Sequence, residues 1–146
     1  MKIALGCDHA GFQLKKAVLD LLSDMGHEVL DSGTDSPESV DYPDFAHAAA
    51  ERVKNKEADA AIVICGSGIG VSISANKVSG IRCALCLTPE MATLAREHNN
   101  ANALAMGARF ISEESAREIV SAFIKTPFEG GRHERRVEKI HKLSDC

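Results

Sequence analysis

Five short apolar runs recur along this chain, and each is followed by a longer segment with the periodicity of an amphipathic helix. The third run, DAAIVIC at 59–65, is continuous and rich in β-branched residues, as in strands buried on both faces of a parallel sheet. The other runs lie at 2–7, 27–33, 81–87 and 102–108. Strands that alternate with helices favour βαβ units. We therefore predict an α/β fold, a Rossmann-like three-layer α/β/α sandwich with a five-stranded parallel sheet.

The segments between these runs predict the helices. Leu14, Val18, Leu21, Leu22 and Met25 share one helical face, and Gly26 is expected to end that helix. Further helices are predicted from Pro43 to about Lys56, from the GSGIG loop to near Gly80, over 88–100 and 112–126, and as a C-terminal helix from Arg132.

Size and composition limit what this fold can be. With 146 residues, 45% hydrophobic and 26% charged, the chain is expected to form a single folded domain over 1–146. A net charge of −4 gives no basic footprint for nucleic acid. No apolar run reaches the roughly eighteen residues of a membrane span, and the short run before Asp8 does not resemble an export signal. Cys7, Cys65 and Cys83 fall in strand-like runs, which favours free thiols and a reducing cytoplasm.

Three polar groups follow predicted strands. Asp8 and His9 come after the first strand, Cys65 ends the third, and 107–109 follows the last with Arg109 at its end. Ligands of open α/β sheets bind outside the carboxyl ends of the strands, near a topological switch point. A single polar residue after a strand is commonly only a cap or a turn, whereas three groups at one edge favour a ligand site.

The glycine loop CGSGIG joins the third strand to a helix. Gly66, Gly68 and Gly70 can expose backbone N–H groups at the helix N-terminus, which suits a phosphate or an oxyanion. Close packing of strand and helix would explain the same glycines. Val71 occupies the third glycine position of the dinucleotide fingerprint, and no Gly-Lys-Ser/Thr follows, so nucleotide binding is disfavoured.

Cys65 stands directly before this loop, where the start of a helix favours a thiolate. A thiolate beside backbone donors suits proton transfer at a carbon next to a carbonyl. A buried, inert cysteine is the alternative interpretation. Cys83 and Cys86 form a C-x-x-C pair within a predicted strand, so they point to opposite faces and do not indicate a metal site.

Two further motifs each allow a structural and a functional interpretation. His98, Asn99 and Asn100 end a predicted helix, as a C-terminal cap would, and an imidazole there could also transfer protons. Arg132 and Arg136 are four residues apart and share one helical face. They could belong to a solvated basic helix, or they could bind a phosphate between them.

Taken together, the motifs GCDHAG, DYPDFA, CGSGIGVSISANK, REHNNAN, MGAR and EGGRHERRV resemble the ribose-5-phosphate isomerase B family, which also includes galactose-6-phosphate isomerase subunits. The resemblance extends from residue 2 to about 143. It implies reversible isomerisation of ribose 5-phosphate and ribulose 5-phosphate through a cis-enediolate, in the non-oxidative pentose phosphate pathway, without a metal or organic cofactor.

The resemblance also implies a role for each matching residue. Cys65 would be the base, and Ser67 with the loop amides from Gly66 through Gly68 and Ile69 to Gly70 would hold the enediolate oxygens. His98 with Asp8 would open the sugar ring. His9, Arg132 and Arg136 would bind the phosphate, and Asn99, Arg109 and Tyr42 its surroundings. Family members without the cysteine use a glutamate at the position of Val71, which is apolar here, so the chain resembles the cysteine branch. Ser67 replaces the threonine common in the family and keeps the hydroxyl.

The family further implies a homodimer, or a tetramer of paired dimers, with active sites at the subunit interface. Two alternatives stay open at this point. The sugar could be a hexose phosphate such as allose or galactose 6-phosphate. The chain could instead be a non-catalytic flavodoxin-like nucleotide-binding module, although it has no Trp and only one Tyr to stack on a flavin.

Overall fold

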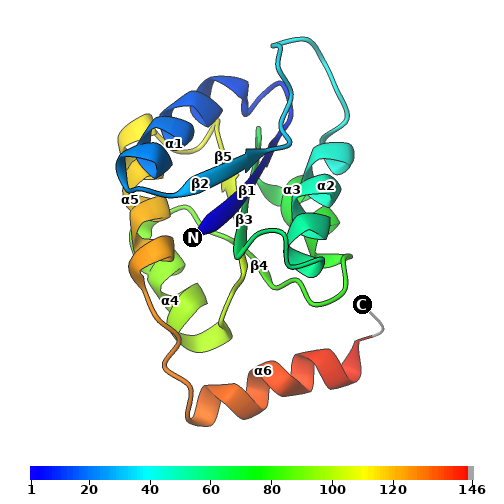
Figure 1. Cartoon of the computed structure of the whole chain (residues 1–146), viewed down its shortest axis with the longest axis vertical. Coiled ribbons are helices and arrows are strands. Elements are labelled where there is room, and N and C mark those ends of the chain that lie inside the picture. The colour runs from blue at the N-terminus through cyan, green and yellow to red at the C-terminus, as the bar shows by residue number, and fades with distance from the viewer. Residues whose placement is uncertain (145–146) are drawn as a thin grey trace.

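The computed structural model describes residues 1–144 and contains one five-stranded parallel sheet. The strands are β1 (Lys2–Cys7), β2 (Glu28–Asp31), β3 (Ala60–Cys65), β4 (Cys83–Leu85) and β5 (Ala103–Gly107). Their order across the sheet is β2-β1-β3-β5-β4, and all four neighbouring pairs are parallel (Figure 1). The predicted number and direction of the strands are confirmed.

Helices cover both faces of this sheet, which confirms the three-layer arrangement (Figure 1). One face carries α1 (Phe12–Asp24), α4 (Pro89–Asn99) and α5 (Glu113–Lys125), and the other carries α2 (Tyr42–Lys54) and α3 (Ile69–Asn76). The C-terminal helix α6 (Arg132–Leu143) lies beyond the amino-terminal ends of the strands and packs against α4.

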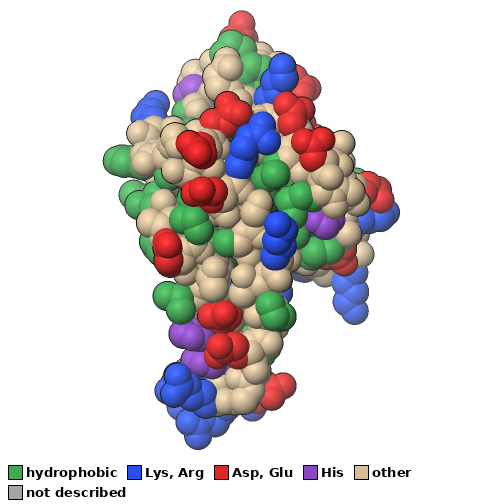
Figure 2. Space-filling model, turned by 90° about the vertical axis from the view of Figure 1, so that its left-hand side faces the viewer, with side chains coloured by type: hydrophobic (Ala, Val, Ile, Leu, Met, Phe, Trp, Pro, Cys, Tyr) green, Lys and Arg blue, Asp and Glu red, His purple; other side chains and the backbone are tan. Residues whose placement is uncertain are grey.

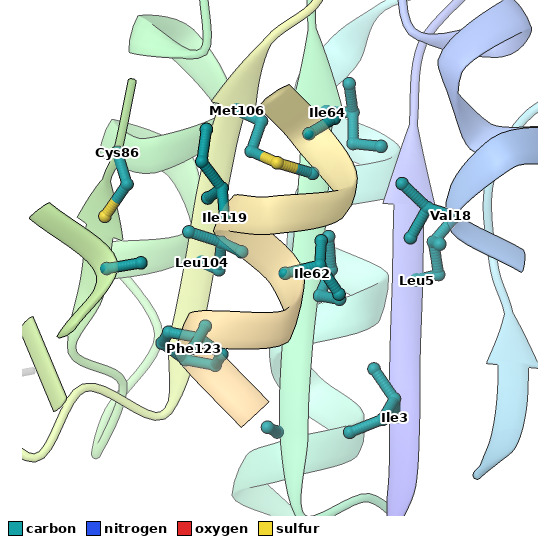
Figure 3. Close-up of a cluster of buried hydrophobic side chains, with 14 of the residues drawn as sticks. Ile3, Leu5, Val18, Ile62, Ile64, Cys86, Leu104, Met106, Ile119 and Phe123 are labelled. Atoms are coloured by element: carbon teal, nitrogen blue, oxygen red, sulfur yellow. The ribbon is translucent and has the colours of Figure 1, made fainter. Parts of the chain in front are cut away.

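The two faces of the sheet are packed with side chains of different size. Toward α1, α4 and α5 the strands present large residues such as Ile62, Leu104 and Met106, which meet Ile119 and Phe123 of α5 (Figure 3). Toward α2 and α3 they present mostly alanines, and α2 contributes alanines in return. Small residues on both sides allow α2 to lie very close to the sheet.

Gly6 marks the closest approach of α2. A Cβ on Gly6 would lie 2.4 Å from the carbonyl oxygen of Phe45, so only glycine fits there. Because Phe45 is in the first turn of α2, this contact fixes the start of the helix, and with it Tyr42, near the carboxyl end of β1.

The sequence predicted most element ends well, but it overestimated two strands. β2 covers 28–31 instead of 27–33, and β4 covers 83–85 instead of 81–87. Both are edge strands. Beside β4 the side chain of Asn76 takes the place of a further strand, accepting from the Cys83 N–H at 2.8 Å and donating to its carbonyl at 2.9 Å. The helix before it accordingly ends at Asn76 and not near Gly80.

Candidate active site

The polar residues meet at the boundary between β1 and β3. These strands are neighbours, but the chain leaves β1 toward α1 on one face and β3 toward α3 on the other, which makes this a topological switch point. A cavity of about 260 Å³ opens at their carboxyl ends. We call it the switch-point pocket. It is lined by Asp8, His9, Ala10, Tyr42, Cys65, Gly66, Ser67, Gly70 and Arg109.

Cys65 is the last residue of β3 and faces the α2–α3 side of the sheet. Its side chain is buried, with 4% of the residue exposed, yet it lines the pocket. The backbone N–H of Gly68 donates to its Sγ at 3.2 Å. A backbone N–H that points at sulfur interacts better with a thiolate than with a neutral thiol, since hydrogen bonds to charged groups are the stronger ones.

The loop after Cys65 uses some of its N–H groups internally, which differs from the expected row of free amides. The Gly68 N–H goes to sulfur, and the Ile69 N–H donates to Ser67 Oγ at 3.2 Å. Gly68 has a φ of +76°, and a Cβ on it would lie 2.9 Å from the Gly107 nitrogen, so both conformation and space require glycine. The Gly70 N–H lies in the first turn of α3, where an α-helix supplies no partner of its own.

Two large side chains lie directly against this loop. A Cβ on Gly70 would come within 2.5 Å of the Tyr42 ring, and one on Gly66 would come within 3.0 Å of the Arg109 guanidinium. The glycines therefore fit both interpretations of the loop. Gly70 keeps a backbone N–H without a helical partner, and Gly66 and Gly70 also allow Arg109 and Tyr42 to pack closely over the pocket.

Asp8 and His9 complete the pocket from the end of β1. The Asp8 Oδ1 accepts from the N–H groups of Ala10 and Gly11 at 2.9 and 3.1 Å, which fixes the carboxylate and leaves Oδ2 for other contacts. Asp8 is 5% exposed. The Nδ1 of His9 accepts from the Val40 N–H at 3.2 Å.

A second group of predicted residues lies elsewhere, between α4 and α6. We call it the α4–α6 cluster; it comprises His98, Glu129, Arg132, His133 and Arg136. The rings of His98 and His133 are stacked, with centroids 4.2 Å apart, and Arg132 Nε donates to His133 Nε2 at 3.4 Å. In Figure 2, histidines adjoin a group of Lys and Arg side chains at the lower end of the molecule, where α6 begins.

The charges of the α4–α6 cluster favour an anion. Possible ligand atoms of His98, Glu129 and His133 lie within 4.8 Å of one another, close enough for a metal ion. However, Arg132 already donates to His133 Nε2, and Arg136 adds a second positive charge. Burial lowers the pKa of His133, and the neighbouring charges of His98, Arg132 and Arg136 lower it further, while that of Glu129 raises it. Two guanidinium groups next to imidazoles suit a phosphate better than a cation.

Within one chain, the pocket and the cluster lie at opposite edges of the sheet. Cys65 is at the carboxyl end of β3, whereas α4 runs back from the carboxyl edge toward α6 (Figure 1). His98 and Asn99 end α4, and His98 stacks on His133 of α6, so both lie at the amino edge. The six residues of β3 span about 20 Å. The expected proximity of His98 to Asp8 is therefore not found within a single chain. Asn99 lines a different cavity, of about 240 Å³, with Arg82 and Ile140.

The remaining described cysteines have environments that suppress reactivity. Burial raises the pKa of Cys7 and of Cys86 to about 11, and that of Cys83 to about 12. All three are free thiols, as is Cys65. Cys83 packs on the α2–α3 side and Cys86 in the opposite core, so the prediction that this pair points to opposite faces is confirmed.

Sequence reasoning did not single out three residues that shape these sites. Val40 acts through its backbone, which no side-chain pattern could reveal. Glu129 and His133 belong to the motif EGGRHERR, in which only the arginines were predicted to bind a ligand. The position of His133 directly after Arg132 could have indicated a role in the same site. Its stacking on His98 could not be predicted, because it depends on how α6 packs against α4.

These features define a class of protein: a doubly wound α/β protein whose site at the switch point combines a thiol, a carboxylate and backbone N–H donors. Such groups serve acid–base chemistry at a carbon next to a carbonyl. No helix within residues 1–144 has the length and apolar character needed to span a bilayer.

Comparison with known proteins identifies the family. The sequence model described as Ribose/Galactose Isomerase matches residues 3–140, and the chain belongs to this family. Ribose-5-phosphate isomerase B of Escherichia coli is 49% identical over 139 residues, which are 95% of this chain and 93% of that protein. The structure of ribose-5-phosphate isomerase B from Clostridium thermocellum superposes with a TM-score of 0.96 at 52% identity, covering 98% and 97% of the two chains. Ribose-5-phosphate isomerase B of Mycoplasma genitalium, solved with bound ribulose-5-phosphate, gives a TM-score of 0.92 at 43% identity, covering 97% and 94%.

Proposed function

We propose that this protein interconverts ribose 5-phosphate and ribulose 5-phosphate. The relatives support this substrate by name, and one of them was solved with ribulose-5-phosphate bound. The single observation in this chain that carries the proposal is Cys65, which lines the switch-point pocket with a backbone N–H directed at its sulfur.

The Cys65 thiolate is the base in this mechanism. It takes the proton from C2 of the open-chain aldose, and negative charge moves onto the C1 oxygen to give a cis-enediolate. The thiol then returns the proton to C1, while a proton passes from the C2 oxygen to the C1 oxygen. Ser67 Oγ already accepts from Ile69, so its hydroxyl hydrogen remains for an enediolate oxygen. The Gly70 N–H can stabilise the same charge as it develops.

Ring opening and phosphate binding involve the other predicted residues. Asp8 and His98 are assigned the proton transfers that open the furanose. His9, Arg132 and Arg136 bind the phosphate, a non-reacting end of the substrate that orients the reacting carbons. Tyr42, Asn99 and Arg109 bind the periphery of the sugar phosphate.

This mechanism requires a second copy of the chain. His98, Arg132 and Arg136 lie at the edge of the sheet opposite to Cys65, so one chain cannot bring them to its own pocket. We propose a homodimer in which each switch-point pocket is completed by the α4–α6 cluster of the partner. We also propose that the protein acts in the cytoplasm, because a reducing compartment keeps cysteines such as these four as free thiols.

Replacement of Cys65 tests the proposal. Cys65→Ala removes the base, and we expect turnover of ribose 5-phosphate to fall by at least about a hundredfold with little change in KM. Cys83→Ala is the matched control, since it removes a thiol outside the pocket and should retain activity close to wild type. A Cys65→Ala enzyme with a near-normal rate would exclude the role of Cys65.

The same assay identifies the preferred sugar phosphate. Rates on ribose 5-phosphate, allose 6-phosphate and galactose 6-phosphate are compared with one enzyme preparation. A higher kcat/KM on either hexose phosphate would replace the pentose assignment while leaving the proton-transfer chemistry unchanged.

A further inference from the structure

His9 is held by the protein backbone in a way that fixes where its hydrogen is. The residue follows β1, is half-buried and lines the switch-point pocket. Its Nδ1 lies 3.2 Å from the backbone nitrogen of Val40, in the segment between β2 and α2. A backbone N–H can only donate, so Nδ1 must accept and carries no hydrogen. The hydrogen of a neutral imidazole is then on Nε2.

The segment that supplies the Val40 N–H is anchored on both sides. At its start, the buried ammonium of Lys15 donates to the Thr34 carbonyl at 2.8 Å and to Asp31 at 2.9 Å. The Thr34 N–H donates to the Cys7 carbonyl at 3.0 Å, next to the end of β1. At its other end, α2 begins with Tyr42, whose ring packs against Gly70. Val40 therefore meets His9 from a defined position.

We propose that the Val40 main chain locks His9 in its Nε2–H tautomer, and that His9 acts in the pocket as a neutral hydrogen-bond donor. A phosphate dianion only accepts hydrogen bonds, so a ring fixed as a donor at Nε2 selects it over groups that donate. The arginines then neutralise the negative charge of the phosphate. The identity of the anion rests on the proposed function, whereas the tautomer does not.

The first experiment needs no substrate. Imidazole ¹⁵N shifts of ¹⁵N-labelled wild-type protein are measured at mildly alkaline pH, and the His9 signals are assigned by their loss in His9→Gln. We expect Nδ1 of His9 to show the shift of an unprotonated nitrogen and Nε2 that of a protonated one. The reverse pattern, or an average of the two tautomers, would overturn the proposal. Isomerase activity has no part in this measurement, so the measurement tests the tautomer even if the proposed function is wrong.

The second experiment removes the donor. Val40→Pro has no N–H at this position, and Val40→Ala keeps it. We expect Val40→Ala to retain the wild-type nitrogen shifts. Val40→Pro should lose the tautomer preference and raise KM for ribose 5-phosphate about tenfold over Val40→Ala, the scale of one hydrogen bond to a charged group, with a smaller effect on kcat. Unchanged His9 shifts in a folded Val40→Pro protein would contradict the role of Val40. If that variant does not fold, the ¹⁵N shifts of His9 in the wild-type protein alone decide whether the proposal holds.

Discussion

At the scale of single residues, the four described cysteines differ in what surrounds each sulfur. Cys7, Cys83 and Cys86 have pKa values raised to about 11 or 12 by burial, and none of them lines the switch-point pocket. Cys65 is also buried, but its sulfur accepts the Gly68 N–H and lines the pocket. Burial alone therefore does not distinguish Cys65 from the other three cysteines; the backbone donor beside its sulfur and its position in the pocket do.

Alkylation should separate these thiols. With iodoacetamide at mildly alkaline pH, we expect Cys65 to be modified well before Cys7, Cys83 and Cys86. Roughly a thousandth of a thiol is ionised three units below its pKa, and only the thiolate reacts. Peptide mass spectrometry at successive times gives the order, and labelling in denaturant shows that every peptide can react. Modification of Cys83 or Cys86 as fast as Cys65 would refute this order.

The sequence located the residues whose position follows from a strand end. Asp8, Cys65 and Arg109 were predicted at one edge because parallel strands end there together, and all three line the pocket. Contacts between segments that are far apart in the sequence could not be predicted. The bond from Val40 to His9 spans 31 residues, and no local pattern indicates it.

At the scale of elements, hydrophobic periodicity was sufficient for the central strands and the helices. It failed at the edges, because a strand's length there depends on its single neighbour: β4 pairs with β5 only over Cys83–Leu85. It also could not reveal that one face of the sheet is built from small residues, since an alanine and an isoleucine count equally as apolar. That face is what brings α2 to the pocket.

Lys15 links α1 to the segment after β2, and its removal should lower stability. Lys15→Met keeps the apolar stem but leaves the Thr34 carbonyl and Asp31 without the ammonium. We expect the free energy of unfolding to fall by about 2 kcal/mol, the scale of hydrogen bonds to a charged group. Lys16→Met, one position along the same helix and exposed, should change it by less than about 0.5 kcal/mol. Urea unfolding followed by circular dichroism measures both, and equal midpoints for the two variants would contradict the role of Lys15.

At the scale of the whole molecule, one chain carries both halves of the proposed site at opposite edges of its sheet. The switch-point pocket is at the carboxyl edge, where β3 ends at Cys65. The α4–α6 cluster is at the amino edge, beyond which α6 lies (Figure 1). In a two-fold dimer the same contact occurs twice, so two chains can form two complete sites. Exposed apolar side chains on α3, Ile69 and Ile73, give further surface that a partner could cover.

Mixing two inactive variants tests this arrangement directly. Cys65→Ala lacks the base and His98→Ala lacks the imidazole, so each homodimer should have very low activity. If every site takes Cys65 from one chain and His98 from the other, a mixed dimer has one intact site and one doubly defective site. Half of randomly mixed dimers are mixed, so co-refolding equal amounts should restore about a quarter of wild-type activity. If both residues came from the same chain, no combination would contain an intact site and the mixture would stay inactive. Sedimentation of the mixture checks that dimers have formed, and inactive mixed dimers would refute the shared site.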